Sequence, residues 1–371
     1  MSGSPRVAIA HDYLTQRGGA ERVVLAILRA FPDATIYTTL YDPEGTFPEF
    51  RQARIVTSPL NRVSLLRRNH RAALPFLPCA VSRLAVDADV LIASSSGWAH
   101  GIRVTGRKLV YCHAPARWLY QAETYLGGST SSSARGRALH ALTPWLRRWD
   151  QRAAASADRY LVNSNVVRGH VRDAYGIQAD VLAPPFGLTV DGRQEPLPEL
   201  ADWAGEGYHL VISRLLPYKN VDRAIEAFRG TPERLVVVGH GPMELQLRRT
   251  LPANVRIVTG ASDDHLRWVY AHSTALVAPS IEDFGLTPLE AAAFGRPTLA
   301  LRAGGYLDTV APGLSGEFFE EPTASAIRSA VEATRGRRWD TEAITRHAES
   351  FSEERFRERL REEVARMAAG V

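Results

Sequence analysis

The sequence predicts an α/β protein of two domains, each built on a parallel sheet, and three observations support this. The chain has 371 residues, which is too long for one ordinary domain and suits two of about 150–200 residues. Short apolar runs alternate with helical stretches in both halves, as in parallel sheets covered by helices on both faces. A stretch rich in Pro, Gly and acids, residues 187–207, interrupts this alternation. We therefore expect domains at residues 1–188 and 189–351, joined by a hinge at that stretch.

The first half begins with an apolar strand followed by a helix, and the chain repeats that unit. Strands are expected at residues 6–10, 34–40, 89–94, 108–113 and 159–163. Helices are expected at residues 20–31, 138–157 and 166–175. Ligands of open α/β sheets bind beyond the carboxyl ends of the strands, so the loops after these strands are candidate sites.

The second half restarts the same pattern. Strands are expected at residues 209–213, 234–238, 255–258 and 274–279. Helices are expected at residues 221–228, 243–251 and 264–272, and one more begins with Pro288 in its first turn, where a missing N–H costs nothing. Two such units joined by a hinge predict a cleft between the carboxyl edges of their sheets.

The last segment, residues 352–369, is expected to be a charged helix with one apolar stripe. Phe356, Leu360 and Val364 recur every four residues, so they share one helix face that must pack against another part of the protein.

Composition limits the class of protein. Two cysteines, Cys79 and Cys112, are too few for a disulfide framework and lack metal-ligand spacing, which fits a reducing cytosol. The apolar run at residues 7–11 is too short for a signal peptide. No stretch approaches the ~20 apolar residues that span a bilayer. We expect a soluble, cytoplasmic protein.

The net charge of +5 is mild, but two stretches concentrate arginine. Residues 50–86 hold seven arginines and no acid, and residues 135–152 hold five arginines beside Trp145 and Trp149, with Asp150 as the single acid. These stretches are either solvated helix faces or a surface that rests on anionic lipid, where each cation adds about 1 kcal/mol. No nucleic-acid module is recognisable, so nucleic acid is not the expected partner.

Two carboxylates stand out in the stretch from Ala278 to Glu290. Glu282 follows the strand at residues 274–279, and Glu290 lies early in the next helix, with a Phe284-Gly285-Leu286 turn between them. The free amides at a helix start favour an anion, and the carboxylates on either side can bind hydroxyl groups. A nucleotide-sugar offers that alternation of ribose hydroxyls, diphosphate and sugar hydroxyls.

Other strand ends carry cations, glycines and a histidine. Arg214 and Lys219 follow the strand at residues 209–213, ahead of a helix whose expected cap is Asn220, and this pair of cations suits a diphosphate. The glycines that could let the backbone approach a ligand are Gly18, Gly19, Gly239, Gly241, Gly304 and Gly305. Further polar candidates are His113, Arg117 and Ser164. Ser164 has an alternative role as a simple helix cap.

Together these segments resemble the retaining glycosyltransferases of family 4, which have the GT-B fold. The resemblance rests on the Glu282/Glu290 spacing, the Arg214/Lys219 pair, the Gly18-Gly19 loop and a Tyr111-x-His113-x-Pro115-x-Arg117 segment, in the family's order. That last segment is similar to one in enzymes that build bacterial surface polysaccharides, many of them mannosyltransferases using GDP-mannose. Those enzymes tend to carry an acid where this chain has Gln121, which leaves the sugar open.

The resemblance implies two Rossmann-like domains and a final helix, residues 352–371, that crosses back onto the first domain. It implies catalytic roles for His113, Arg214, Lys219 and Glu282. The implied donor-binding residues are Gly19, Gly241, Phe284, Gly285, Leu286 and Glu290, and the implied acceptor-binding residues are Gly18 and Arg117. We expect no cofactor and no metal, because two cations already stand at the diphosphate position. The expected partners are a nucleotide-sugar donor, a glycan or polyprenyl-diphosphate-linked acceptor and an anionic membrane surface.

Three alternatives stay open at this point. The same fold could use a UDP-sugar such as UDP-glucose or UDP-N-acetylglucosamine. It could be a sugar-nucleotide epimerase, although the Arg214/Lys219 and Glu282/Glu290 set fits transfer better. It could also be a basic binding module that keeps the fold and has lost the chemistry.

Overall fold

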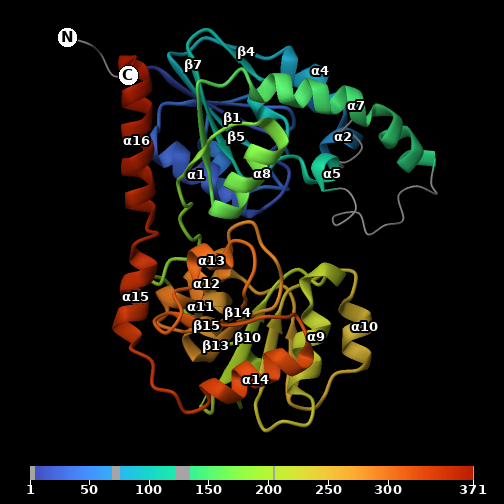
Figure 1. The fold of residues 1–371 in the computed structure, drawn as a ribbon, viewed down its shortest axis with the longest axis vertical. Helices are drawn as coiled ribbons and strands as arrows, with labels where there is room; N and C mark the ends of the chain where they lie inside the picture. The colour runs from blue at the N-terminus through green and yellow to red at the C-terminus, as the bar shows by residue number, and fades with distance from the viewer. Residues whose placement is uncertain (1–4, 69–75, 122–133, 204, 371) are drawn as a thin grey trace. The chain divides into compact units, whose positions relative to one another are not determined.

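A computed structural model describes residues 5–68, 76–121, 134–203 and 205–370, with the side chains of 68 and 134–141 left aside. The chain divides into two compact units (Figure 1). The N-terminal unit comprises Met1–Pro184 together with Glu353–Val371, and the C-terminal unit comprises Pro185–Ser352. Each unit is described by itself below. Arg71, in the first basic stretch, lies outside the described residues.

The N-terminal unit is built on a parallel sheet, whose described strands run in the order β3-β2-β1-β5-β7-β8-β9. Its strands are β1 Val7–His11, β2 Thr35–Thr38, β3 Ile55–Thr57, β5 Val90–Ser95, β7 Arg107–Cys112, β8 Arg159–Val162 and β9 Asp180–Val181. A separate pair joins β4 Ala85–Val86 to β6 Arg103–Val104. Strand β5 is buried throughout and β1 is buried after Val7, as expected where helices cover both faces.

The three predicted helices of this unit are present, with ends shifted by a few residues, as α1 Gly19–Ala30, α7 Ala134–Ala154 and α8 Asn165–Tyr175. The structure adds the shorter helices α2 Ser64–Arg68, α4 Leu77–Ser82 and α5 Arg117–Tyr120, which were not predicted. Short 3-10 turns lie at η1 Pro48–Gln52, η2 Pro59–Arg62 and η4 Ala99–Gly101. On α1, Val24 and Ile27 are fully buried against the sheet, which is the apolar face that its sequence predicts.

The C-terminal helix α16, Glu353–Ala369, belongs to the N-terminal unit and lies beside α1 (Figure 1). Phe356, Leu360 and Val364 are buried in the same core as β1 and β5, and the Phe356 ring meets Tyr111 edge to face at 5.7 Å. Glu363 of this helix accepts from Arg159 at 3.2 Å. The predicted stripe is confirmed, and so is the return of the helix to the first domain.

The C-terminal unit holds a second parallel sheet, with its described strands in the order β12-β11-β10-β13-β14-β15. These strands are β10 Tyr208–Ile212, β11 Leu235–Val238, β12 Val255–Val258, β13 Ser273–Ala278, β14 Thr298–Leu301 and β15 Gly316–Phe319. Its helices are α9 Val221–Phe228, α10 Glu244–Arg249, α11 Asp263–His272, α12 Leu286–Ala293, α13 Tyr306–Thr309, α14 Ala324–Thr334 and α15 Thr341–Glu349, and its 3-10 turns are η5 Pro198–Leu200 and η6 Pro217–Lys219.

The stretch predicted as a hinge is packed rather than open. The structure divides the chain at Pro184, and residues 187–207 belong to the C-terminal unit. Leu197, Leu200 and Trp203 from that stretch are buried in the core of the unit. Prolines and acids dominate its composition, but three apolar side chains at suitable spacing fix it to the sheet.

Of the two residues predicted as helix caps, Ser164 caps its helix with its side chain and Asn220 does not. Ser164 caps α8, because its hydroxyl accepts from the Val167 N–H at 3.2 Å. Asn220 occupies the predicted N-cap position of α9, but its side chain makes no capping hydrogen bond. Its backbone is left-handed, with φ 54°, and its amide instead donates to the Pro279 carbonyl at 2.9 Å. Asn220 therefore ties the loop after β10 to the loop after β13.

Candidate functional site

The predicted cations and carboxylates of the C-terminal unit gather at one edge of its sheet. Strand β10 leads into Arg214 and Lys219, and β13 leads into Glu282. The two strands are neighbours and run parallel, so their carboxyl ends open at the same edge. Residues from both loops therefore meet, although more than sixty residues separate them in the sequence.

Lys219 and Glu282 form an ion pair at this edge. The Lys219 ammonium donates to Glu282 Oε1. Lys219 is only 6% exposed, while the Glu282 side chain keeps 27% of its surface open. The Ser280 hydroxyl also donates to Glu282 Oε1, at 2.7 Å. Glu282 is therefore held in place with part of its carboxylate facing outward.

Gly285 begins the helix between the two carboxylates. It has φ 88°, a left-handed conformation, and α12 starts at Leu286 directly after it. A Cβ at this position would stand 2.5 Å from Cδ1 of Tyr306, so only glycine fits. Phe284 is buried beneath the turn. The first amides of α12 have no partners within the helix, which suits them to an anionic or hydroxyl ligand.

Glu290 lies on the second turn of α12 and is half-buried. Its Oε2 accepts from the Tyr270 hydroxyl at 2.8 Å. Burial, and then the neighbouring Glu290 charge, raise the pKa of Tyr270 well above its ordinary value, so this hydroxyl keeps its proton and acts as a donor. Tyr270 thus orients the carboxylate that was predicted to bind the ribose.

Arg214 stands exposed at the end of β10, and its guanidinium donates to the Tyr218 hydroxyl at 3.2 Å. The loop after β11 runs directly against this segment, since Leu215 N–H donates to the His240 carbonyl at 2.9 Å. A Cβ on Gly241 would lie 2.5 Å from the Leu215 carbonyl oxygen, and one on Gly239 would lie 1.8 Å from that of Ser213. Both glycines are required so that the two loops can touch.

Gly304 and Gly305 complete the edge beyond β14. The Gly305 N–H donates to the Glu282 carbonyl at 2.8 Å, and a Cβ on Gly304 would stand 2.4 Å from that same oxygen. This pair supports the backbone of Glu282. It also starts α13, whose Tyr306 hydroxyl lies 3.2 Å from Ser280 Oγ.

Sequence reasoning missed Tyr270 and Ser280, which donate to the two carboxylates, and Tyr306, whose hydroxyl lies beside that of Ser280. The two tyrosines resemble ordinary core aromatics in the sequence, and only their hydroxyl contacts distinguish them. Ser280 lies two residues before Glu282, and this proximity was the one available signal.

In the N-terminal unit, His113 follows β7 at the carboxyl edge of its sheet. Its Nε2 lies 2.8 Å from Ser94 Oγ at the end of β5. Its ring meets Tyr111 edge to face at 5.2 Å, and its carbonyl accepts from the Asn163 amide at 3.0 Å. Burial, reinforced by the charge of His11, lowers the pKa of His113 to about 3, so it is neutral at physiological pH.

Gly18 and Gly19 lie where α1 begins. Gly18 has an extended backbone, with φ −125°, and a Cβ there would stand 2.6 Å from Glu21 Oε2. Its small size therefore serves the buried Glu21 carboxylate, a residue that sequence reasoning did not assign. Arg117 opens the short helix α5, four residues after His113, and is half-buried.

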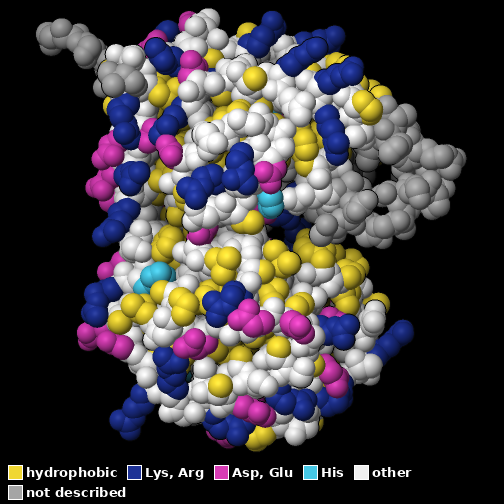
Figure 2. Space-filling model, in the orientation of Figure 1, with side chains coloured by type: hydrophobic (Ala, Val, Ile, Leu, Met, Phe, Trp, Pro, Cys, Tyr) yellow, Lys and Arg dark blue, Asp and Glu magenta, His cyan; other side chains and the backbone are white. Residues whose placement is uncertain are grey.

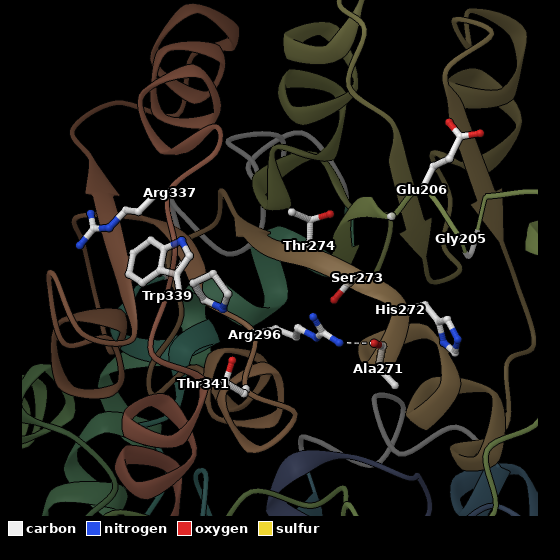
Figure 3. Close-up of a pocket in the computed structure, with 13 residues that line it drawn as sticks. Gly205, Glu206, Ala271, His272, Ser273, Thr274, Arg296, Arg337, Trp339 and Thr341 are labelled. Atoms are coloured by element: carbon white, nitrogen blue, oxygen red, sulfur yellow. Dashed lines mark hydrogen bonds between the residues drawn. The ribbon is translucent and has the colours of Figure 1, made fainter.

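A cavity of 460 Å³ in the C-terminal unit lies elsewhere (Figure 3). It opens at the amino end of β10, β13 and β14, where Gly207, Ser273 and Pro297 line it. None of the predicted site residues does so. Its charged side chains already bond to the protein: Arg296 to the Ala271 carbonyl, Arg337 to Glu317 at 2.6 Å and Glu206 to Arg234 at 2.8 Å.

Within the described ranges, no three His, Cys, Asp or Glu residues cluster as metal ligands would. No helix in the same part of the chain has the length and apolarity to cross a membrane.

Two family models match the chain in succession. Residues 17–184 match the model of Glycosyltransferase Family 4, and residues 201–334 match that of Glycosyl transferases group 1. The chain belongs to glycosyltransferase family 4. The first match covers the His113 edge, and the second covers the Lys219 and Glu282 edge.

Curated relatives of this family 4 chain differ in their substrates. It is 30% identical over 248 residues to the D-inositol 3-phosphate glycosyltransferase of Rhodococcus erythropolis, which covers 59% of this chain and 56% of that one. It is 27% identical over 161 residues to the O-antigen chain mannosyltransferase C of Escherichia coli, covering 40% and 41%. It is 35% identical over 130 residues to the glycogen synthase of Pseudomonas aeruginosa, covering 33% and 25%. The chain thus matches between a quarter and just over half the length of these proteins.

Solved structures show that this family 4 chain has the GT-B fold. HepE of Anabaena, in complex with UDP-glucose, superposes with a TM-score of 0.69 at 17% identity, covering 97% of this chain and 99% of that one. Sucrose-phosphate synthase of Thermosynechococcus elongatus superposes with a TM-score of 0.70 at 15% identity, covering 99% and 100%. The predicted fold class and family are confirmed.

Proposed function

We propose that this chain moves a hexose, with retention at the anomeric carbon, from a nucleotide-sugar onto a lipid-linked or glycan acceptor. The observation that carries the proposal is the carboxyl edge of the C-terminal sheet. There Lys219 and Glu282 are in contact, Arg214 lies on the same loop as Lys219, and Glu290 follows on the helix that Gly285 starts. Cations, helix amides and carboxylates alternate as the parts of a nucleotide-sugar do.

Each residue of this edge has a role in the proposal. Glu290, oriented by Tyr270, would bind the ribose hydroxyls. Glu282 and the amides after Phe284 would bind the hydroxyls of the transferred sugar. Arg214 and Lys219 would stabilise the negative charge that grows on the departing diphosphate. Because those two cations supply the charge, we expect no metal requirement.

Retention is proposed to follow a front-face path. The acceptor oxygen bonds to the anomeric carbon on the face from which the diphosphate departs, and the departing phosphate oxygen takes the acceptor's proton. This path needs no protein nucleophile. The acceptor would bind on the N-terminal unit, at the edge that carries Gly18, Gly19, His113 and Arg117.

GDP-mannose is the donor we propose. The similarity to an O-antigen chain mannosyltransferase supports mannose, as does the Tyr111-x-His113-x-Pro115-x-Arg117 segment. A UDP-sugar is the second candidate, favoured by the structural similarity to HepE, which was solved with UDP-glucose.

A basic surface with exposed apolar side chains on the N-terminal unit supports a polyprenyl-diphosphate-linked acceptor. Exposed apolar side chains, Leu142 and Trp145 on α7, lie on the same helix as the exposed Arg148 and Arg152. Figure 2 shows dark blue and yellow side chains together at the upper right of this unit, where Figure 1 places α7. We propose that the protein rests on the cytoplasmic face of an anionic membrane through this surface.

Thermal unfolding with GDP-mannose, GDP, UDP-glucose, UDP-N-acetylglucosamine and UDP tests the donor. A ligand at 100 times its dissociation constant adds about 2.7 kcal/mol of stability. Stabilisation by the guanine pair alone supports mannosyl transfer, and stabilisation by the uridine ligands alone replaces mannose with the second candidate. If none of the five stabilises the protein, and Glu290→Ala keeps the biological activity, the chain is a binding module rather than a transferase.

A further inference from the structure

Four polar side chains form a connected line beneath the carboxyl edge of the N-terminal sheet: Glu21, His11, Ser94 and His113. Three of them end neighbouring strands, since His11 closes β1, Ser94 lies at the end of β5, and His113 follows β7. His11 and Ser94 face each other in register. Glu21 comes from the first turn of α1. Ser94 is fully buried, and His11 and Glu21 are at most 2% exposed.

The contacts of His11 favour a proton on each ring nitrogen. Its Nδ1 lies 3.1 Å from the Ser94 carbonyl oxygen, which can only accept, so Nδ1 must be a donor. Its Nε2 faces the Glu21 carboxylate, 3.8 Å from Oε1. Burial alone would lower the pKa of His11, but the hydrogen bond and charge of Glu21 and the charge of Asp12 outweigh it and raise that pKa. The charged form of His11 is therefore favoured opposite Glu21.

The Ser94 hydroxyl links His11 to His113 by hydrogen bonds. Its Oγ also lies 3.1 Å from His11 Nδ1 and so accepts from that N–H. The hydroxyl has one proton, it is fully buried, and the acceptor within reach is His113 Nε2 at 2.8 Å. Buried hydroxyls keep their hydrogen bonds, so Ser94 donates to His113. His113 Nε2 is therefore the unprotonated nitrogen.

We propose that Glu21, His11 and Ser94 are positioning residues that fix His113 as the neutral Nδ1–H tautomer, so that its Nδ1 presents a hydrogen-bond donor to a hydroxyl of the bound saccharide. A neutral imidazole has one donor nitrogen and one acceptor nitrogen. In His113 the acceptor is Nε2, which already bonds to the Ser94 hydroxyl. His113 consequently takes no proton from the acceptor alcohol through Nδ1. The part of the inference that concerns saccharide rests on the proposed function; the tautomer does not.

Burial keeps His113 neutral, and the charge of His11 reinforces this. A second positive charge beside His11 would be unfavourable in the same buried environment. Glu21 favours the charged form of His11, and that charge adds to the burial that keeps His113 neutral. A Cβ on Gly18 would stand 2.6 Å from Glu21 Oε2, so the glycine leaves room for this carboxylate at the start of α1.

Nitrogen-15 NMR of the full chain labelled at histidine tests the tautomer without substrate. His113→Gln identifies the ring signals by their loss. The expected spectrum at pH 7 shows a protonated Nδ1 and an unprotonated Nε2 for His113. A protonated Nε2, or an imidazolium, would overturn the proposal, whatever the enzyme's activity turns out to be.

Ser94→Ala and Glu21→Gln test the line itself. In Ser94→Ala the Nε2 partner is lost, so His113 should populate both tautomers, and kcat should fall several-fold with little change in the nucleotide-sugar KM. In Glu21→Gln the pKa of His11 should drop, and its Nε2 proton signal should vanish near pH 7. The matched control is Ser58→Ala, a buried serine of the same unit whose hydroxyl donates to the Thr39 carbonyl at 2.8 Å; it should leave the His113 spectrum unchanged. An unchanged His113 spectrum in Ser94→Ala contradicts the proposal.

Discussion

Lys219 and Glu282 are in direct contact, although one follows β10 and the other follows β13. The ammonium is almost buried, and the carboxylate is partly open. In the proposed function, the cation assigned to the diphosphate and the carboxylate assigned to the sugar therefore share one hydrogen bond. Donor binding would then bring negative phosphate to a cation that is already oriented, which is the preorganisation that stabilises a transition state.

Lys219→Ala should lower kcat by about 10²–10³, as the loss of a preorganised charge-stabilising donor does in other enzymes. Folding should survive, because Glu282 keeps its bond from Ser280 and access to water. Steady-state kinetics and circular dichroism measure the two effects. Arg223→Ala is the control, since Arg223 is an exposed cation on the adjoining helix α9. Equal turnover in the two variants would remove Lys219 from the mechanism.

Glu290→Ala should raise the KM for the nucleotide-sugar with less effect on kcat. A hydrogen bond to a charged group contributes about 1.5–3 kcal/mol, so the expected increase is roughly 10–150-fold. Tyr270→Phe removes only the orienting bond and should raise KM about 5-fold. Tyr208→Phe is the matched control, because that buried hydroxyl donates to the Val269 carbonyl at 2.9 Å; it should cost stability without changing KM.

Gly285→Ala should destabilise the C-terminal unit and abolish donor binding. The left-handed backbone costs about 1–2 kcal/mol with a Cβ, and the contact with the Tyr306 ring adds overpacking of about 1–3 kcal/mol. Gly230→Ala measures the cost of the left-handed backbone alone, because Gly230 has φ 71° and open space around it. Calorimetry should show the smaller loss for Gly230→Ala, with nucleotide-sugar binding intact. Equal losses would mean that the Tyr306 contact is relieved without cost.

The sequence predicted the strand ends that carry the site but not the contacts between them. Lys219 and Glu282 were predicted separately, and they meet because β10 and β13 are neighbours while β11 and β12 lie on the other side of β10. Strand spacing does not contain that order. The His11–Ser94 contact depends in the same way on β1 pairing with β5.

Local sequence patterns do not predict the role of a side chain that bonds to a residue far away in the sequence. Asn220 has the residue type of a cap, yet its amide bonds to Pro279 across the sheet edge. Tyr270 and Tyr306 have the pattern of core aromatics, yet their hydroxyls face Glu290 and Ser280. The periodic stripe of α16 was predictable because helix geometry alone aligns Phe356, Leu360 and Val364.

His209→Phe should flatten the loss of stability on acidification. Burial lowers the pKa of His209 to about 4, below its ordinary 6.5. Between these two pH values, His209 is protonated in the unfolded chain and neutral in the folded chain. Stability therefore falls as pH drops from 6.5 toward 4, by up to about 3 kcal/mol from this group. Thermal midpoints between pH 7.5 and 4.5 measure it.

Phe228→Leu is the control for that experiment, because the Phe228 ring packs on His209 at 5.2 Å without titrating. It should lower the midpoint at every pH and keep the wild-type slope. A His209→Phe slope equal to that of wild type would show that other groups set the acid response.

Vesicles containing anionic lipid should bind the protein through α7, and neutral vesicles should not. Arg148 and Arg152 are exposed beside Trp145, whose exposed fraction is 48%. Each cation near such a surface contributes about 1 kcal/mol, so reversing both charges with Arg148→Glu and Arg152→Glu should weaken binding by well over tenfold. Trp145→Ser should weaken it further by removing apolar insertion.

Arg359→Glu on α16 is the control, since its side chain is 61% exposed outside the proposed surface. Cosedimentation should also show release by salt, because screening shortens the reach of these charges. Equal binding of the double variant and the control would place the membrane contact elsewhere.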